Sequence, residues 1–169
     1  VLNGGTYDNV TYIAFDAHSG TIDRDGDVIT YAGLEPITDN LNVIDRVIST
    51  APGVPLLTDD EATLTNNNDG TLTLASVSLI PTFESITFTG PTNSLTINLG
   101  GDLGLPFISK DLLTINSFNQ SGIDLIINGE DGKDEINVVG AITVGDLIIN
   151  AEIITVSATI TANNVTLTS

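Results

Sequence analysis

The most constraining feature of the sequence is a Leu-x-Ile-Asn motif that occurs four times in its second half, with two weaker copies. The copies are LTIN at Leu95–Asn98, LTIN at Leu113–Asn116, LIIN at Leu125–Asn128, LIIN at Leu147–Asn150, EINV at Glu135–Val138 and VTLT at Val165–Thr168. Internal repetition of this kind indicates a repeat architecture, in which each copy is one element of a stacked unit.

The spacing of the copies gives the length of that unit. Their apolar residues form two interleaved series, with steps of 18, 23 and 18 residues in the first and of 22 and 18 in the second. The first series is Leu95, Leu113, Ile136 and Ile154, and the second is Leu125, Leu147 and Val165. Each step is about one coil of a β-solenoid, whose short strands stack on the equivalent strands of the next coil. The two series therefore predict two stacked sheets of one solenoid.

Stacking gives a physical role to the residue types of the motif. Ile, Leu and Val at equivalent positions would form continuous apolar ladders inside the solenoid. The Asn that ends each full copy would form an amide ladder, in which each side chain bonds the next. Asn also tolerates the left-handed backbone conformation that bends require.

The rest of the chain also predicts an all-β fold. Thr, Ile, Val, Leu and Asn dominate, whereas the helix formers Lys, Glu, Gln and Arg are scarce. No window of eleven or more residues has the 3.6-residue period of a helix. The segment ATLT-NNNDG-TLTL at residues 62–74 predicts a local hairpin or a loop between two short strands. Short strands between turn residues also fit an antiparallel β-sandwich, which is the alternative to the solenoid.

The Pro-rich stretch APGVPLL at Ala51–Leu57 predicts a boundary. We expect residues 1–57 to form an irregular β region or elaborated first coils. Residues 58–169 are expected to form the solenoid coils, which could be continuous with the first part. The chain ends inside a strand-like pattern, so we also expect it to be an excerpt of something longer or a processed subunit.

Charge and composition exclude several classes of function. With 22 acidic and four basic residues the net charge is −18, so neither nucleic acid nor an anionic membrane is an expected partner. The absence of cysteine excludes disulfides, zinc–thiolate sites and a thiol nucleophile. No apolar run approaches the roughly 20 residues that insertion into a membrane requires.

Catalytic motifs are also missing from the sequence. The four basic residues form no cluster, and no nucleophile elbow, phosphate loop or dinucleotide fingerprint occurs. We therefore expect a protein that is not an enzyme. A polysaccharide-acting enzyme is a weaker alternative, which rests only on analogy with other β-solenoids.

The first of two acidic turns that are candidate calcium sites spans residues 23–27. Asp23, Asp25 and Asp27 alternate around a glycine in this turn. Calcium takes about six to eight oxygen ligands, and alternating carboxylates on a tight turn can supply several of them. The order of residues is not that of an EF-hand, and a solvated acidic turn is the alternative interpretation.

The second acidic turn is GEDGKDEIN at Gly129–Asn137, which resembles the glycine–aspartate nonapeptide of repeats-in-toxin proteins. The residues that match are Gly129, Gly132, Asp134 and Ile136. Glu130 replaces the second glycine of the pattern. That family binds calcium between successive turns, so the resemblance implies calcium as a cofactor, with Asp131 and Asp134 as ligands. A Gly-Asp turn between two coils is the alternative.

Residues 94–169, and above all GDLIINAEIITVSATITANNVTLTS, resemble the coils of filamentous-haemagglutinin-like and related giant bacterial surface proteins. The resemblance implies a right-handed parallel β-helix and carries over no catalytic residue. It also implies a structural module of an extracellular bacterial surface or fibre-forming protein. Its expected partners are copies of itself or other modules of a longer chain. The alternative is a calcium-assisted adhesin that binds glycans.

An uncapped solenoid exposes strand edges, which invite end-to-end stacking. We therefore expect filament growth through the last strand of the sequence. The residues of this predicted edge are Asn163, Asn164, Val165, Thr166, Leu167 and Thr168.

Overall fold

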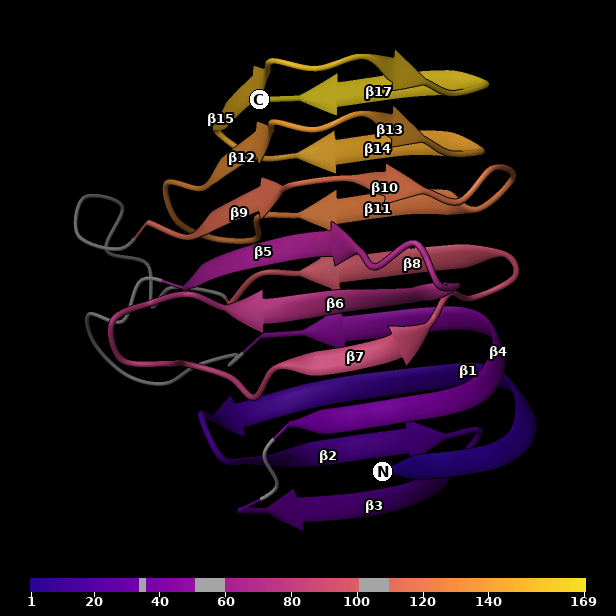
Figure 1. The fold of residues 1–169 in the computed structure, drawn as a ribbon. Helices are drawn as coiled ribbons and strands as arrows, with labels where there is room; N and C mark the ends of the chain where they lie inside the picture. The colour runs from indigo at the N-terminus through magenta and orange to yellow at the C-terminus, as the bar shows by residue number, and fades with distance from the viewer. Residues whose placement is uncertain (34–35, 51–59, 101–109) are drawn as a thin grey trace.

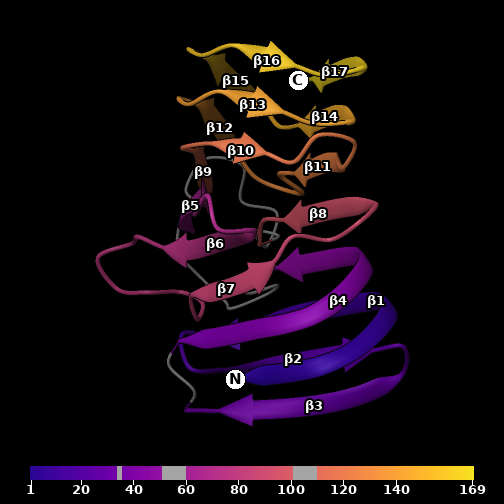
Figure 2. The same ribbon diagram turned by 45° about the vertical axis from the view of Figure 1, so that its right-hand side comes forward.

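The structure, a computed structural model of the chain, describes residues 1–33, 36–50, 60–100 and 110–169. All regular secondary structure in these residues is β, which confirms the predicted class. The strands form a 14-stranded, mostly parallel sheet and a three-stranded parallel sheet. Figures 1 and 2 show the large sheet curving until it nearly closes on itself, with the N-terminal and C-terminal parts of the chain at opposite ends of the molecule. The described residues include no helix long and apolar enough to cross a membrane.

The C-terminal half repeats a group of three strands, which we call a coil. The first coil is β9 (Leu112–Ile115), β10 (Phe118–Asn119) and β11 (Asp124–Asn128); the second is β12 (Glu135–Val138), β13 (Ile142–Thr143) and β14 (Asp146–Asn150); the third is β15 (Ile153–Val156), β16 (Ile160–Thr161) and β17 (Asn164–Thr168). Equivalent strands of successive coils pair in parallel, as β9–β12–β15, β10–β13–β16 and β11–β14–β17. The repeat predicts the β9–β12–β15 and β11–β14–β17 stacks correctly, whereas neither of its two series includes the third stack, β10–β13–β16.

The two predicted ladders need one correction. The first ladder contains Leu113, Ile136 and Ile154, as expected. Leu95 does not belong to it, because Leu95 pairs with Leu125 of the other ladder. The position beside Leu113 is taken by Ala62, since β5 (Glu61–Asn66) pairs with β9. The step from Leu95 to its true neighbour Leu125 is longer than one coil. The assumption of a constant step of one coil therefore placed Leu95 in the wrong ladder.

The N-terminal half is less regular. Its other strands are β1 (Leu2–Asp16), β2 (Ser19–Arg24), β3 (Asp27–Ala32), β4 (Ile37–Ser49), β6 (Thr71–Ser76), β7 (Ile86–Thr89) and β8 (Ser94–Asn98). Strands β1, β2 and β3 form an antiparallel meander, and β1 also pairs in parallel with β4. The first part of β4 pairs with β7 and its second part with β8. Strand β8 then pairs with β11, which joins this half to the coils.

Antiparallel pairing in the described residues is confined to β1–β2–β3 and β5–β6–β7. The second group includes the hairpin predicted at residues 62–74, which is confirmed as β5–β6. The mostly parallel pairing elsewhere differs from the antiparallel β-sandwich, the alternative prediction. The predicted boundary at residues 51–57 lies outside the described residues.

The predicted amide ladder is present at the ends of β8, β11 and β14. Nδ2 of Asn128 donates to Oδ1 of Asn98 at 2.8 Å, and Nδ2 of Asn150 donates to Oδ1 of Asn128 at 3.0 Å. The inward-facing apolar side chains of these strands, such as Leu125 and Leu147, are fully buried. An apolar interior and a bonded amide edge therefore both repeat with the coils.

Candidate functional site

The most distinctive surface of the molecule is the outer edge of the third coil, which we call the C-terminal edge. Strands β15, β16 and β17 are each the last in their order of pairing, so each has a hydrogen-bonded neighbour on one side only. Figure 2 shows these strands together at one end of the molecule. All six residues that the sequence predicts as an edge lie in β17 or just before it.

Side chains that face the interior are uncovered at the C-terminal edge. Val165 and Leu167 are 48% and 46% exposed, whereas their partners in the coil below, Leu147 and Ile149, are fully buried. Val156 of β15 is also exposed, although its partner Val138 is buried. Sequence reasoning missed Val156, although it occupies the same place in its ladder as Val138. The third coil therefore presents an open cross-section of the apolar interior.

The backbone of β17 also has unused hydrogen-bonding groups. The carbonyl of Thr168 accepts a hydrogen bond from the N–H of Ala151, so this residue faces β14. Because successive residues of a strand direct their N–H and C=O groups to alternate sides, Val165 and Leu167 direct theirs to the open side. Apolar side chains and unpaired backbone groups thus coincide at the same two residues.

The C-terminal edge is uncharged. No Asp, Glu, Lys, Arg or His occurs from Ile153 to Ser169, in a chain whose net charge is −18. The carboxylates beside it are Asp146, whose Oδ1 accepts a hydrogen bond from Nδ2 of Asn164 at 3.0 Å, and Glu130 and Glu152, which line a surface pocket of about 330 Å³ together with Thr168 and Ser169. The surface suited to stacking is therefore also one on which like-charge repulsion is weak.

Asp134, one of the predicted calcium ligands, belongs to a ladder of carboxylates. Its Oδ1 accepts the backbone N–H of Asp111 at 3.3 Å, and its own N–H donates to Oε2 of Glu152 at 2.9 Å. The N–H of Asp60 donates in turn to Oδ1 of Asp111 at 2.7 Å. Each of these acidic residues directly precedes a strand of the same ladder, a recurrence that sequence reasoning missed. Asp131, by contrast, is exposed.

The other predicted calcium ligands lie at the tight connection between β2 and β3. The carboxylate of Asp25 accepts the backbone N–H groups of Asp8 and Asn9 at 2.9 and 2.7 Å. Asp23 accepts the N–H of Gly26 at 2.7 Å, and Asp27 forms an ion pair with Arg24. These carboxylates therefore hold the hairpin and its neighbour β1 in place.

The described residues contain no group of three or more His, Cys, Asp and Glu side chains arranged to hold a metal ion. Calcium binding at Asp23, Asp25 and Asp27, and at Asp131 and Asp134, stays a prediction.

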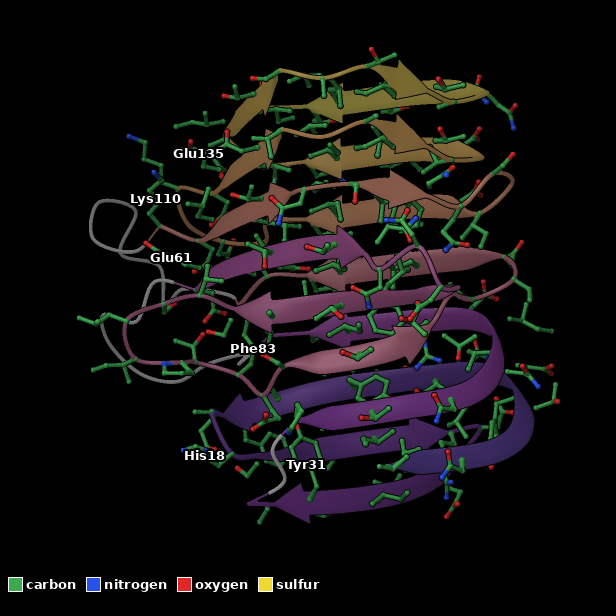
Figure 3. All side chains as sticks on the ribbon, viewed as in Figure 1. His18, Tyr31, Glu61, Phe83, Lys110 and Glu135 are labelled. Carbon is green, nitrogen blue, oxygen red and sulfur yellow. The ribbon has the colours of Figure 1, made fainter. Side chains whose placement is uncertain are left out.

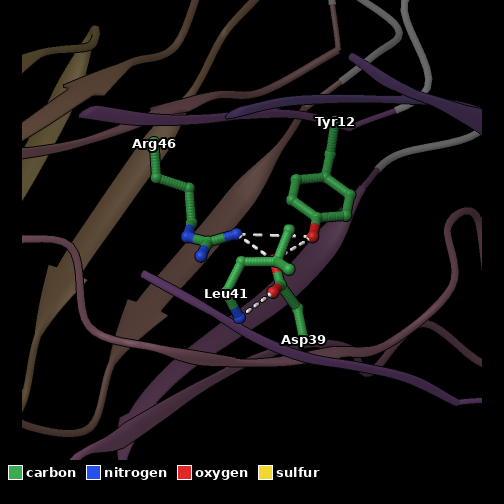
Figure 4. A network of polar contacts seen from close by, with 4 residues as sticks. All are labelled: Tyr12, Asp39, Leu41 and Arg46. Atoms are coloured by element: carbon green, nitrogen blue, oxygen red, sulfur yellow. Dashed lines mark hydrogen bonds and ion pairs between the residues drawn. The ribbon is translucent and has the colours of Figure 1, made fainter. Parts of the chain in front are cut away.

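A polar cluster inside the N-terminal half was missed by sequence reasoning. Arg46 and Asp39 are fully buried and form an ion pair, and the hydroxyl of Tyr12 donates to the same carboxylate (Figure 4). The guanidinium also lies over the rings of Tyr12 and Phe88, 5.7 and 5.1 Å from their centroids. Burial raises the pKa of Tyr12 well above its ordinary value. Because Arg46, Asp39 and Tyr12 are all fully buried, the cluster has no access to a substrate.

A further ion pair lies on the surface of the coils. Nζ of Lys110 is 2.7 Å from Oε2 of Glu135, and the hydrogen bond from Lys110 lowers the pKa of that carboxyl group. Figure 3 shows this pair far from His18 and Tyr31, which lie at the other end of the molecule. The single histidine, His18, is therefore not close to the ion pair of Lys110 and Glu135.

Comparisons with protein-family models, curated proteins and solved structures give no match to this chain. The resemblances to filamentous-haemagglutinin-like and repeats-in-toxin proteins therefore stay at the level of the residues that suggested them.

Proposed function

We propose that this chain is a structural module of an extracellular bacterial surface or fibre-forming protein, which associates by β-strand stacking at the C-terminal edge. In this proposal the coils are those of a right-handed parallel β-helix. The parallel pairing of three successive coils supports the stacking, and the resemblance of residues 94–169 supports the handedness and the surface location. The proposed role depends on association at the C-terminal edge and not on a chemical reaction, so no catalytic residue is assigned.

The observation that carries the proposal is the contrast between the last two coils. Leu147 and Ile149 are fully buried because the third coil covers them, whereas Val165 and Leu167 lack such a layer. Covering these side chains would remove apolar surface from water at roughly 25 cal/mol per Å². An added strand would also satisfy the backbone groups of the open edge. Both contributions favour association at this surface.

The proposal is tested by placing charge at the C-terminal edge. The double variant Val165→Asp with Leu167→Asp puts carboxylates on the inward positions of β17, where a stacked layer would bury them. The matched control is Thr143→Asp, which adds a carboxylate to the outer face of β13, between the uncharged residues Asn119 and Thr161. Sedimentation velocity over a wide range of protein concentration measures association, and circular dichroism checks the fold.

We expect the unchanged chain and Thr143→Asp to associate as concentration rises. The folded double variant is expected to stay monomeric, because stacking would bury its unpaired carboxylates. Association that persists in the folded double variant would contradict the proposal, as would an unchanged chain that stays monomeric at every concentration.

A further inference from the structure

The two ends of the stack differ in charge and polarity. This difference determines which surface can dock on the C-terminal edge. The ladder that begins at Val165 can be followed through β14, β11, β8, β4, β1 and β2 to β3. Its members are Val165, Leu147, Leu125, Leu95, Arg46, Val10, Arg24 and Asp27. The position of the apolar Val165 is therefore taken at the other end by an exposed aspartate that is paired with Arg24.

The N-terminal end also covers its own interior. Tyr31 of β3 is only 3% exposed, and Ile22 of β2 is 1% exposed. Stacking of one copy head-to-tail on another would place the Arg24–Asp27 pair against Val165. The charged pair would lose water without gaining a polar partner, which is unfavourable. The two ends are thus poorly matched at the position of Val165, whereas the ladder of Leu167 ends at the partly buried, apolar Ile29.

A second C-terminal edge is the better match, because both surfaces are then apolar and uncharged. We infer that the third coil docks on the third coil of a second copy of this chain, related by a two-fold axis, and so forms a closed dimer. This inference rests on the proposed function, since it requires the C-terminal edge to associate. It replaces open-ended filament growth of residues 1–169 with a closed assembly, because an isologous contact uses the C-terminal edge of both copies.

The backbone geometry of β17 fixes the register of the dimer. A two-fold axis makes the two copies of β17 antiparallel, and residues that exchange both hydrogen bonds must direct their N–H and C=O groups to the open side. Val165 and Leu167 are these residues. Pairing Val165 with Leu167 of the second copy uses all four groups on each strand and continues the apolar interior across the contact. Thr166 then lies opposite Thr166 of the second copy, at the axis.

This register predicts a specific cross-link. Antiparallel residues that do not exchange hydrogen bonds have Cα atoms about 4.5 Å apart, within the roughly 4.4–6.8 Å that a disulfide requires. The chain has no cysteine, so Thr166→Cys introduces a single thiol on an outward-facing position. The matched control is Ile148→Cys, because Ile148 is the partner of Thr166 one coil further from the edge. Its two copies would be three strand spacings apart, about 14 Å, too far for a disulfide.

The experiment combines sedimentation velocity of the unchanged chain with oxidation of both cysteine variants by glutathione disulfide. We expect the unchanged chain to shift from monomer to dimer as concentration rises, and to stop there. Covalent dimer is expected for Thr166→Cys, at least ten times faster than for Ile148→Cys.

Other outcomes separate this inference from the proposed function. Assemblies larger than a dimer, or fibres by electron microscopy, would overturn the two-fold contact while the stacking function stands. A dimer in which Thr166→Cys cross-links no faster than the control would also overturn the inferred register and axis. A chain that stays monomeric at every concentration would overturn both the inference and the proposed function.

Discussion

Arg46 lies opposite Leu95 in the parallel pair of β4 and β8, so a guanidinium and a leucine side chain occupy equivalent inward positions on neighbouring strands. Both residues are fully buried. Leu95 begins the apolar ladder of the coils, whereas Arg46 binds Asp39 within the N-terminal half. The apolar ladder of Leu95 therefore ends at Arg46, whereas the next inward pair of the same two strands, Ile48 and Ile97, is apolar on both sides.

The ion pair predicts a large effect of removing its acidic member alone. Asp39→Ala would leave the buried guanidinium without its carboxylate and would also remove the acceptor of the Leu41 N–H. We expect it to lower the free energy of unfolding by about 3–5 kcal/mol. The double variant Asp39→Ala with Arg46→Leu should lose less, because its interior holds no unpaired charge. Urea unfolding of both variants measures this difference, and equal losses would show that the charge is not the cause.

The amide ladder predicts graded effects along its length. Asn128→Ala removes hydrogen bonds to both Asn98 and Asn150, whereas Asn150→Ala removes the one to Asn128. At about 1 kcal/mol for each bond, we expect losses of about 2 and about 1 kcal/mol in the free energy of unfolding. Urea unfolding checks the order of the two variants. A larger loss for Asn150→Ala than for Asn128→Ala would be inconsistent with a ladder that contributes bond by bond.

Tyr31 predicts a loss of stability in alkaline solution. Burial, followed by the carboxylates of Glu84 and Asp16, raises the pKa of Tyr31 from 10.0 to about 12. Because the folded-state pKa is the higher one, the stabilising contribution is complete below pH 10.0 and is lost as the pH rises towards about 12. Tyr31→Phe should therefore make the decline in the urea midpoint over this interval shallower. The same slope in both proteins would exclude Tyr31 as a source of the decline.

The acidic turns predict how calcium affects stability. Asp23 and Asp25 already accept backbone hydrogen bonds, and Asp27 is paired with Arg24. We therefore expect the thermal midpoint to change little between millimolar calcium and a chelator. A rise of several degrees in calcium would support the predicted sites. Loss of that rise in the triple variant of these aspartates to asparagine would place the ion at this turn.

The repeated part of the fold could be predicted because each of its interactions recurs. Asn98, Asn128 and Asn150 end successive copies of one motif, and stacking brings their amides into contact. The pairing of Leu95 could not be predicted in the same way. A strand far away in sequence, β5, takes the place beside β9, and motif spacing contains no information about that intervening strand.

The buried cluster of Arg46, Asp39 and Tyr12 belongs to no sequence repeat, so no repeat could predict it. Arg46 interrupts an alternating apolar strand, and its partners Asp39 and Tyr12 come from a separate part of β4 and from β1. The edge at Val165 and Leu167 was predictable as a strand. The contrast between this edge and the charged N-terminal end could not be predicted. Asp27 and Val165 belong to one ladder only because the strands between them pair in a particular order, which the sequence does not reveal.

Amide hydrogen exchange of β17, measured residue by residue at low and high protein concentration, tests association at the C-terminal edge most directly. The N–H groups of Val165 and Leu167 face the open side, whereas that of Thr166 faces β14 and serves as an internal control. We predict that exchange at Val165 and Leu167 slows markedly at high concentration, while Thr166 changes much less. Exchange rates at Val165 and Leu167 that are the same at every concentration would contradict the account.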